Sequence, residues 1–391
     1  MQASRALRFV VLLGVVSLFA DVTYEGARSA TGPFLAMLGA SAFAVALVSG
    51  GGELVGYVLR FWSGRLADRT RRYWTITAVG YAVNLLAVPL LALAGSWPVA
   101  ATLIVVERAG KALRTPARDA MLSYATATTG RGWGFGLHEA LDQVGATLGP
   151  LVVAAVALQG VGYRPAFAVL LLPALAALAT LAAAWRMFPH PESLEPASVR
   201  LSPHGFPRRF WVYLAASCLV AVGYADFPLL AYHFGQAGIV PLGWIPALYG
   251  LAMAVDAVAA LVFGRWFDRL GVRVLAVSTV LSACYAPLAF GNRLSLAIAG
   301  SVLWGIGMGA QESIMRAAIA EMTPAERRGT SYGVFNMAYG VSWFVGSALV
   351  GWLYTRSLTA IVVFVVLVQL AAAPCFLLSA RGPAAREPDT P

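Results

Sequence analysis

Charged residues lie inside apolar stretches of this chain, where a charged side chain is costly. Asp21, Glu25 and Arg28 follow one another at spacings of four and three residues, so on a helix they share one stripe, which Tyr24 flanks. Two carboxylates one turn apart do not both ionise easily once they leave water, so one of them is expected to hold a proton. The alternative is that Arg28 pairs with Glu25 and the set only locks the helix to a neighbour.

Other acids fall at the same depth of neighbouring apolar runs. At about 1.5 Å of rise per residue, and against a hydrocarbon core about 30 Å thick, the acids near the middle are Glu53, Glu107, Asp142, Asp226 and Asp256. Arg108 and Lys111 are the nearest bases. We expect these acids, with Asp21 and Glu25, to form a central cavity whose surplus of acid suits protons or positively charged substrates.

Two further pairs are spaced one helical turn apart. His138 and Asp142 could relay protons, or could form a satisfied pair that does not titrate. Glu312 and Arg316 can neutralise each other, and for them structural pairing is favoured. No phosphate loop, metal-ligand cluster or nucleophile constellation is visible, so the sequence predicts no enzyme, no cofactor and no metal. Concentrative transport would then need an ion gradient.

The composition predicts the elements that position these residues. Apolar residues make up 59% of the chain and charged residues 12%, whereas roughly 25% charged is usual for soluble domains. Apolar runs near 20 residues predict membrane helices, and the net charge of +10 sits in the short loops between them, which argues against a nucleic-acid partner. The expected spans are 7–38, 42–64, 73–94, 98–123, 132–158, 165–187, 210–234, 242–264, 272–290, 294–320, 331–354 and 358–378.

A proline-rich polar connector divides these twelve spans into two halves. We predict an N-terminal six-helix bundle over 1–188, a linker over 189–209, a C-terminal six-helix bundle over 210–380 and a disordered tail over 381–391. Most loop arginines fall on one side, which places both termini and the linker in the cytoplasm by the positive-inside rule.

One short basic loop occurs in each half. Gly64-Arg65-Leu66-Ala67-Asp68-Arg69-Thr70-Arg71-Arg72 recurs as Gly264-Arg265-Trp266-Phe267-Asp268-Arg269-Leu270-Gly271-Val272-Arg273. This G-x-x-x-D-R-x-G-x-R pattern resembles the loop between helices 2 and 3 of the major facilitator superfamily, which is repeated between helices 8 and 9. The first copy carries Thr70 where the family has glycine. The resemblance implies an all-α membrane protein of twelve helices in two pseudo-symmetric bundles.

The same resemblance implies a cytoplasmic latch. Asp68 is expected beside the start of the eleventh helix and Asp268 beside the start of the fifth, because a helix N-terminus favours a nearby carboxylate. Gly64 and Gly264 would let the helix ends approach. Arg69 and Arg269 would reach acids in the same layer.

Two more segments carry resemblances. The run Gly110-Lys111-Ala112-Leu113-Arg114-Thr115-Pro116-Ala117-Arg118-Asp119 is similar to the fourth helix of a bacterial branch of the superfamily. Pro116 should kink or loosen that helix, and Arg114 and Arg118 are expected to reach the inner interface, as a gate or as a contact to anionic lipid. Gly145 to Pro150 resembles the antiporter motif, although the two glycines could equally be a packing seam.

These observations predict a proton-coupled secondary transporter that works by alternating access, with export of small organic molecules favoured. The alternatives are uptake or facilitated diffusion of a cationic molecule, and a membrane sensor or scaffold that does not transport. The expected partners are a small-molecule substrate, protons and the lipid bilayer. The expected state is a monomer in the bacterial inner membrane.

Overall fold

The computed structural model describes residues 2–129, 131–191, 207–322 and 328–380 of the 391-residue chain. Within these ranges the secondary structure is helical, and ten helical segments are long and apolar enough to cross a membrane. Two predicted spans fall outside the ten. The fourth contains the charged run from Glu107 onwards, and the ninth, Arg273–Ala289, is shorter. Together they make the twelve spans that the apolar runs predict.

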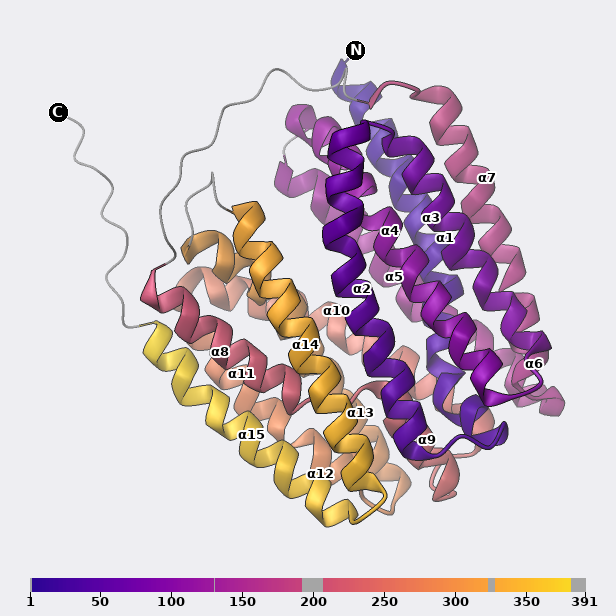
Figure 1. Ribbon diagram of the computed structural model, residues 1–391, viewed down its shortest axis with the longest axis vertical. Coiled ribbons are helices and arrows are strands. Elements are labelled where there is room, and N and C mark those ends of the chain that lie inside the picture. The colour runs from indigo at the N-terminus through magenta and orange to yellow at the C-terminus, as the bar shows by residue number, and fades with distance from the viewer. Residues whose placement is uncertain (1, 130, 192–206, 323–327, 381–391) are drawn as a thin grey trace.

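The first six spans form one bundle around its own hydrophobic core, which extends from Ala6 to Phe188. Its helices are α1 (Gln2–Met37), α2 (Ala42–Thr70), α3 (Tyr73–Leu90), α4 (Trp97–Thr129), α5 (Arg131–Val156), α6 (Tyr163–Val169) and α7 (Leu171–Met187). The sixth predicted span is divided between α6 and α7. Figure 1 shows this bundle in indigo to magenta.

The last six spans form a second bundle, with a core drawn chiefly from residues between Phe210 and Phe376. Its helices are α8 (Arg208–Val222), α9 (Phe227–Gln236), α10 (Ile245–Leu270), α11 (Arg273–Ala283), α12 (Tyr285–Ala289), α13 (Leu294–Met322), α14 (Arg328–Tyr354) and α15 (Leu358–Ser379). The pairs α8–α9 and α11–α12 fill the seventh and ninth predicted spans.

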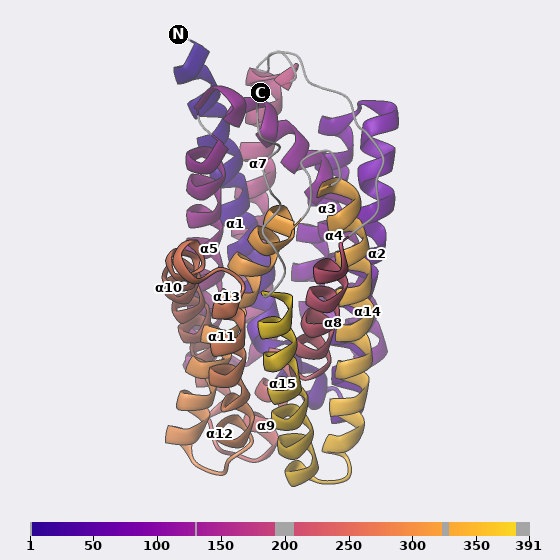
Figure 2. The same ribbon diagram turned by 90° about the vertical axis from the view of Figure 1, so that its left-hand side faces the viewer.

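The two bundles meet along two seams. α14 packs against α2 and α10 packs against α5, and Figure 2 shows these pairs on opposite sides of the C-terminal bundle. α1 begins at the upper end of the molecule in Figure 1, whereas α15 begins at the lower end and runs upward. We call the upper end the termini end and the opposite end the loop end.

The α2–α14 seam is tight toward the loop end and opens toward the termini end. A Cβ atom added to Gly351 would lie 2.5 Å from Ala46, and one added to Gly340 would lie 2.6 Å from Tyr57. Two turns nearer the termini end on the same stripe, a Cβ on Gly333 would meet no heavy atom of the described chain within 4 Å. The bundles therefore pack at the loop end and diverge toward the termini end (Figure 1).

The fourth span continues through Pro116 as one helix, α4. A proline cannot donate to the carbonyl four residues earlier, which here belongs to Ala112. Ser63 of α2 donates its hydroxyl to that carbonyl at 2.9 Å. A neighbouring helix thus satisfies the freed group, as membrane helices require.

The seventh predicted span, in contrast, is interrupted. The backbone leaves the helix from Gly223 to Asp226, between α8 and α9. Gln369 of α15 donates to the carbonyls of Val220 and Gly223 at 3.4 and 3.2 Å. Ala225 donates its N–H to the Tyr285 hydroxyl at 2.6 Å and accepts from the Trp304 indole at 2.9 Å. These side chains replace the lost helical hydrogen bonds, so the interruption is a built part of the fold.

The two copies of the basic loop share a residue with a positive φ angle, and in the first copy it is not the one that the sequence indicated. Arg71 has a φ angle of 54° and Gly271 one of 59°. Each donates its N–H at 2.8 Å to the carbonyl four residues earlier, that of Ala67 or Phe267. Arg71, and not Thr70, therefore stands where the second copy has its glycine, and an arginine here adopts a conformation that glycine adopts at no steric cost.

Candidate functional site

A single guanidinium, that of Arg28 in α1, joins carboxylates from three segments. It lies 2.8 Å from Asp226 at the start of α9, 3.4 Å from Glu53 of α2 and 3.8 Å from Glu25 of α1. Asp226 caps α9 and accepts a hydrogen bond from the Phe227 N–H at 3.0 Å. The break between α8 and α9 therefore positions one carboxylate against the opposite bundle.

Two bases of α4 extend this arrangement. Arg108 lies 3.6 Å from Glu53 and 3.4 Å from Glu107, and the Lys111 ammonium lies 3.7 Å from Glu25. We call the connected set the central network, which consists of Glu25, Arg28, Glu53, Glu107, Arg108, Lys111 and Asp226. Four carboxylates face three cations in it, so one proton or one positive charge would balance the set.

Hydroxyl and amide groups complete the central network. Tyr249 of α10 donates to Glu25 at 2.6 Å, and Ser49 of α2 donates to Asp226. Asn84 of α3 donates to a Glu107 carboxylate oxygen at 2.6 Å. Glu25 and Asp226 each have partners in both bundles, so the network ties α1 and α2 to α9 and α10.

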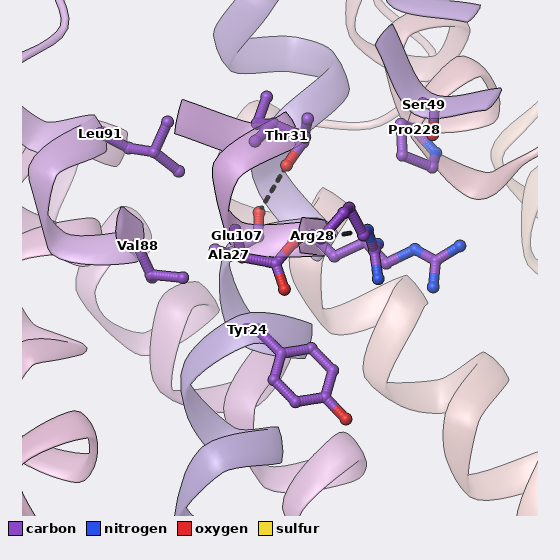
Figure 3. A pocket seen from close by; sticks show the side chains of 11 residues that line it. Tyr24, Ala27, Arg28, Thr31, Ser49, Val88, Leu91, Glu107 and Pro228 are labelled. Atoms are coloured by element: carbon purple, nitrogen blue, oxygen red, sulfur yellow. Dashed lines mark hydrogen bonds and ion pairs between the residues drawn. The ribbon is translucent and has the colours of Figure 1, made fainter. Parts of the chain in front are cut away.

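A narrow cavity adjoins the central network. Tyr24, Arg28 and Thr31 of α1, Ser49 of α2, Glu107 and Arg108 of α4 and Pro228 of α9 supply its polar and inter-bundle lining. Val88 and Leu91 form an apolar wall, and Figure 3 shows these side chains around the cavity. A ligand there would meet both a guanidinium and a carboxylate.

A second polar cluster lies wholly within the N-terminal bundle. Ser17 of α1 contacts His138 of α5 at 3.1 Å and accepts from Arg118 of α4 at 3.0 Å. His138 in turn lies 3.5 Å from Asp142. Asp21 packs beside this cluster, since a Cβ added to Gly145 would lie 2.9 Å from the Asp21 Cβ. Asp21 and Asp142 are therefore neighbours across the α1–α5 contact.

Arg114 lies inside the N-terminal bundle and is only 1% exposed. Its guanidinium lies 4.1 Å from the Tyr81 ring centroid and 5.7 Å from that of Tyr24. The Lys111 ammonium lies 3.9 Å from the same Tyr24 ring. Tyr24 thus connects the α4 cations to α1 by cation–π contact, which strengthens when the groups are removed from water.

The structure brings some of the predicted residues together and separates others. Glu25, Arg28, Glu53 and Asp226 meet directly, with Glu107 and Arg108 beside them. Asp256 is buried in α10 beside Gly309 of α13, away from the central network. Gly64, Arg69, Gly264 and Arg269 lie near the termini ends of α2 and α10. The side chains of Asp68, Asp268, Glu312 and Arg316 lie outside the part of the chain that the structure describes.

Sequence reasoning missed several residues that hold the site. Tyr249, Ser49 and Asn84 are hydrogen-bond partners of the acids, and Gln369 supports the helix break. Gln369 carried a usable signal, because it is a polar residue inside the most apolar of the ten long spans. The others lie on helices whose rotation the sequence does not specify.

Comparison with known proteins agrees with this architecture. The family model described as Major Facilitator Superfamily matches residues 15–240 and 210–391. The chain belongs to the major facilitator superfamily. It is a multi-pass membrane protein, and its function is transport of the type found in this superfamily.

Relatives and solved structures support the same assignment. An uncharacterised protein of Mycobacterium tuberculosis is 45% identical over 377 residues, which is 95% of this chain and 92% of the relative. An uncharacterised MFS-type transporter of Methanocaldococcus jannaschii is 25% identical over 363 residues, with 89% of each chain covered. The crystal structure of a point mutant of the nucleoside transporter NupG has a TM-score of 0.76 at 11% identity and covers 95% of this chain and 99% of that one. The NupG likeness concerns the fold alone.

Proposed function

We propose that this protein is a proton-coupled secondary transporter that exports small organic molecules across a bacterial inner membrane by alternating access. The observation that carries the proposal is the ion pair between Arg28 and Asp226, because it joins the two bundles at the interruption of the seventh span. Secondary transporters place their sites at such interfaces, where discontinuous helices meet.

A proton on Asp226 would couple proton binding to movement of the two bundles. Protonation removes the negative charge that holds Arg28 across the interface, while Glu25 and Glu53 still neutralise Arg28 within its own bundle. The inter-bundle link then weakens without leaving a buried cation unpaired, which would be costly. Proton binding thereby favours separation of α9 from α1, and proton release favours their return.

Export is proposed from the likeness of Gly145 to Pro150 to the antiporter motif. The glycines of this motif also have a packing role, since a Cβ on Gly145 would lie 2.3 Å from the Leu18 carbonyl oxygen and one on Gly149 2.4 Å from that of Val22. A second candidate is uptake or facilitated diffusion of a cationic molecule. The four carboxylates against three cations favour it, because a substrate cation could balance the network in place of a proton.

Flux measurements test the proposal. Purified protein in proteoliposomes is given a pH gradient, and a substrate chosen by thermal-shift screening is followed together with the internal pH. Proton-coupled export predicts that substrate accumulates against its gradient as protons move the opposite way. Flux that ignores the pH gradient and follows only the substrate gradient would favour the facilitator.

A further inference from the structure

α14 carries a column of aromatic side chains that contacts α2 and the break between α8 and α9. Phe335, Tyr339 and Trp343 follow one another at every fourth residue, with ring centroids 5.5 and 5.9 Å apart. Tyr224, in the break between α8 and α9, lies 5.8 Å from Trp343. Tyr57 of α2 meets Tyr339 from the N-terminal bundle at 6.0 Å. We call Phe335, Tyr339, Trp343 and Tyr224 the aromatic column.

Two polar groups at this column have no hydrogen-bond partner among the described residues. Within the described residues, neither the indole N–H of Trp343 nor the hydroxyl of Ser347, one turn further on, has a hydrogen-bond partner. Trp343 is 4% exposed and Ser347 2% exposed. Buried tryptophan N–H groups normally have a hydrogen-bond acceptor, because a buried donor without a hydrogen bond costs free energy. The site therefore provides donors to which the described part of the chain brings no acceptor.

The position of the column explains what could supply that acceptor. Tyr339 and Trp343 flank Gly340, where the packed part of the α2–α14 seam ends. On α2, Tyr57 lies one turn from Glu53, so the column faces a helix that also carries a carboxylate of the central network. Alternating access requires the bundles to move about this interface. A molecule that enters between them would have the aromatic rings of the column on one side and the charged network on the other.

We propose that the aromatic column lines one side of the substrate site and determines its specificity. It selects planar aromatic or heteroaromatic molecules that carry a hydrogen-bond acceptor for Trp343. This inference rests on the proposed transport function and adds the substrate class to it. Rings stack favourably on rings at these centroid distances. An acceptor on the substrate would also accept a hydrogen bond from the indole N–H. A molecule with a saturated ring of the same size could make this hydrogen bond but could not stack on the column.

Matched pairs of probes test the ring preference. Full-length protein in nanodiscs is assayed by saturation binding with benzamide, benzoate and benzoylcholine, each against its cyclohexane analogue. Within a pair the charge and the acceptor are the same and only the ring differs. At least one aromatic member is expected to bind, with its saturated analogue at least about tenfold weaker. Equal binding within every pair, or no binding by any aromatic member, would overturn the inference.

Variants of α14 locate the effect. Trp343→Leu should abolish the preference for the aromatic ring. Trp343→Phe should keep that preference and bind about tenfold more weakly, because it retains the ring and loses the N–H. Trp352→Leu, at an exposed position of the same helix, is the control and should bind as the parent does. If Trp343→Leu does not fold, the Phe variant decides, and unaltered affinity in it would contradict the role of Trp343.

The binding assay contains no pH gradient, so it is independent of proton coupling. A protein that binds the aromatic probes and ignores the pH gradient in proteoliposomes would keep this inference and lose the proposed coupling. A protein that couples transport to protons and binds both members of each pair equally would keep the proposed coupling and lose this inference.

Discussion

Arg28 of α1 and Asp226 at the start of α9 lie 2.8 Å apart and form an ion pair between the two bundles. The two residues are far apart in sequence. Arg28 also forms ion pairs with Glu25 and Glu53, and Asp226 also accepts hydrogen bonds from Ser49 and the Phe227 N–H. The pair thus connects the broken helix of one half to the acidic stripe of the other.

Asp226→Asn tests the pair directly. Loss of the charge should destabilise the arrangement seen here by about 1–3 kcal/mol, because Arg28 loses its shortest ionic contact and keeps two longer ones. Spin labels at the loop ends of α2 and α14 should report a larger share of widely separated bundles, and pH-driven flux should be lost. Asp256→Asn is the matched control, since Asp256 is equally buried and lies away from the network. Unchanged distances in Asp226→Asn, or the same change in both variants, would contradict the link.

Gln369→Leu tests the support of the helix break. The substitution keeps the size of the side chain and leaves the carbonyls of Val220 and Gly223 without their side-chain donor. The expected loss of stability is about 1–3 kcal/mol, seen as a lower melting temperature in detergent. Gln159→Leu makes the same change at an exposed position and should have little effect. A melting temperature that is equally lowered in both variants would argue against a specific role for Gln369.

The residues with a positive φ angle in the two loops predict opposite effects of substitution. Arg71→Gly should stabilise the protein by about 1 kcal/mol, because the φ angle of 54° no longer carries a side-chain penalty. Gly271→Ala should destabilise it by about 1–3 kcal/mol, because its φ of 59° and ψ of −149° lie in a region that is essentially restricted to glycine. Chemical unfolding of both variants measures the sign of the change in the free energy of unfolding. Should Arg71→Gly prove less stable than the parent, contacts of the arginine side chain would outweigh the backbone strain.

The sequence predicted the spans well because a membrane imposes a length and a composition on each helix. It predicted the breaks poorly. Pro116 indicated a kinked or loosened helix, and the sequence did not indicate that Ser63 on a neighbouring helix satisfies the carbonyl that the proline frees. Asp226 followed by Pro228 is a helix-start signal just after Gly223. The groups that satisfy the interruption, such as Gln369 and Tyr285, could not be predicted because they lie far along the chain.

The position of each acid along its helix could be predicted from the sequence, and the grouping of the acids could not. Depth follows from position along a helix, whereas contact depends on how each helix is rotated and which helix it faces. Glu53 and Asp226 share depth and meet at Arg28. Asp256 is also buried and lies beside Gly309 of α13, in its own bundle. Helix packing, which tertiary contacts decide, separates the two cases.

The last prediction concerns the loop aspartate Asp68, whose side chain lies outside the described part of the chain. We predict that in the second state of the transport cycle Asp68 meets the start of α14, where the helix N-terminus attracts a carboxylate by about 0.3–1 kcal/mol when exposed and up to about 2 kcal/mol when partly buried. The bundles diverge at that end in the present structure. Contact there would therefore oppose the state seen here.

Asp68→Asn should accordingly raise the population of the state that is open at the termini end and slow the transport cycle, while probe binding at the centre persists. Distances between spin labels at the termini ends of α2 and α14 measure this population. Asp268→Asn should act in the same direction through the start of α5, since the loops are repeated. Glu139→Gln, an exposed change on α5, is the control. If Asp68→Asn lowers the melting temperature and leaves the distance distribution as in the parent, the aspartate only stabilises its loop and there is no latch.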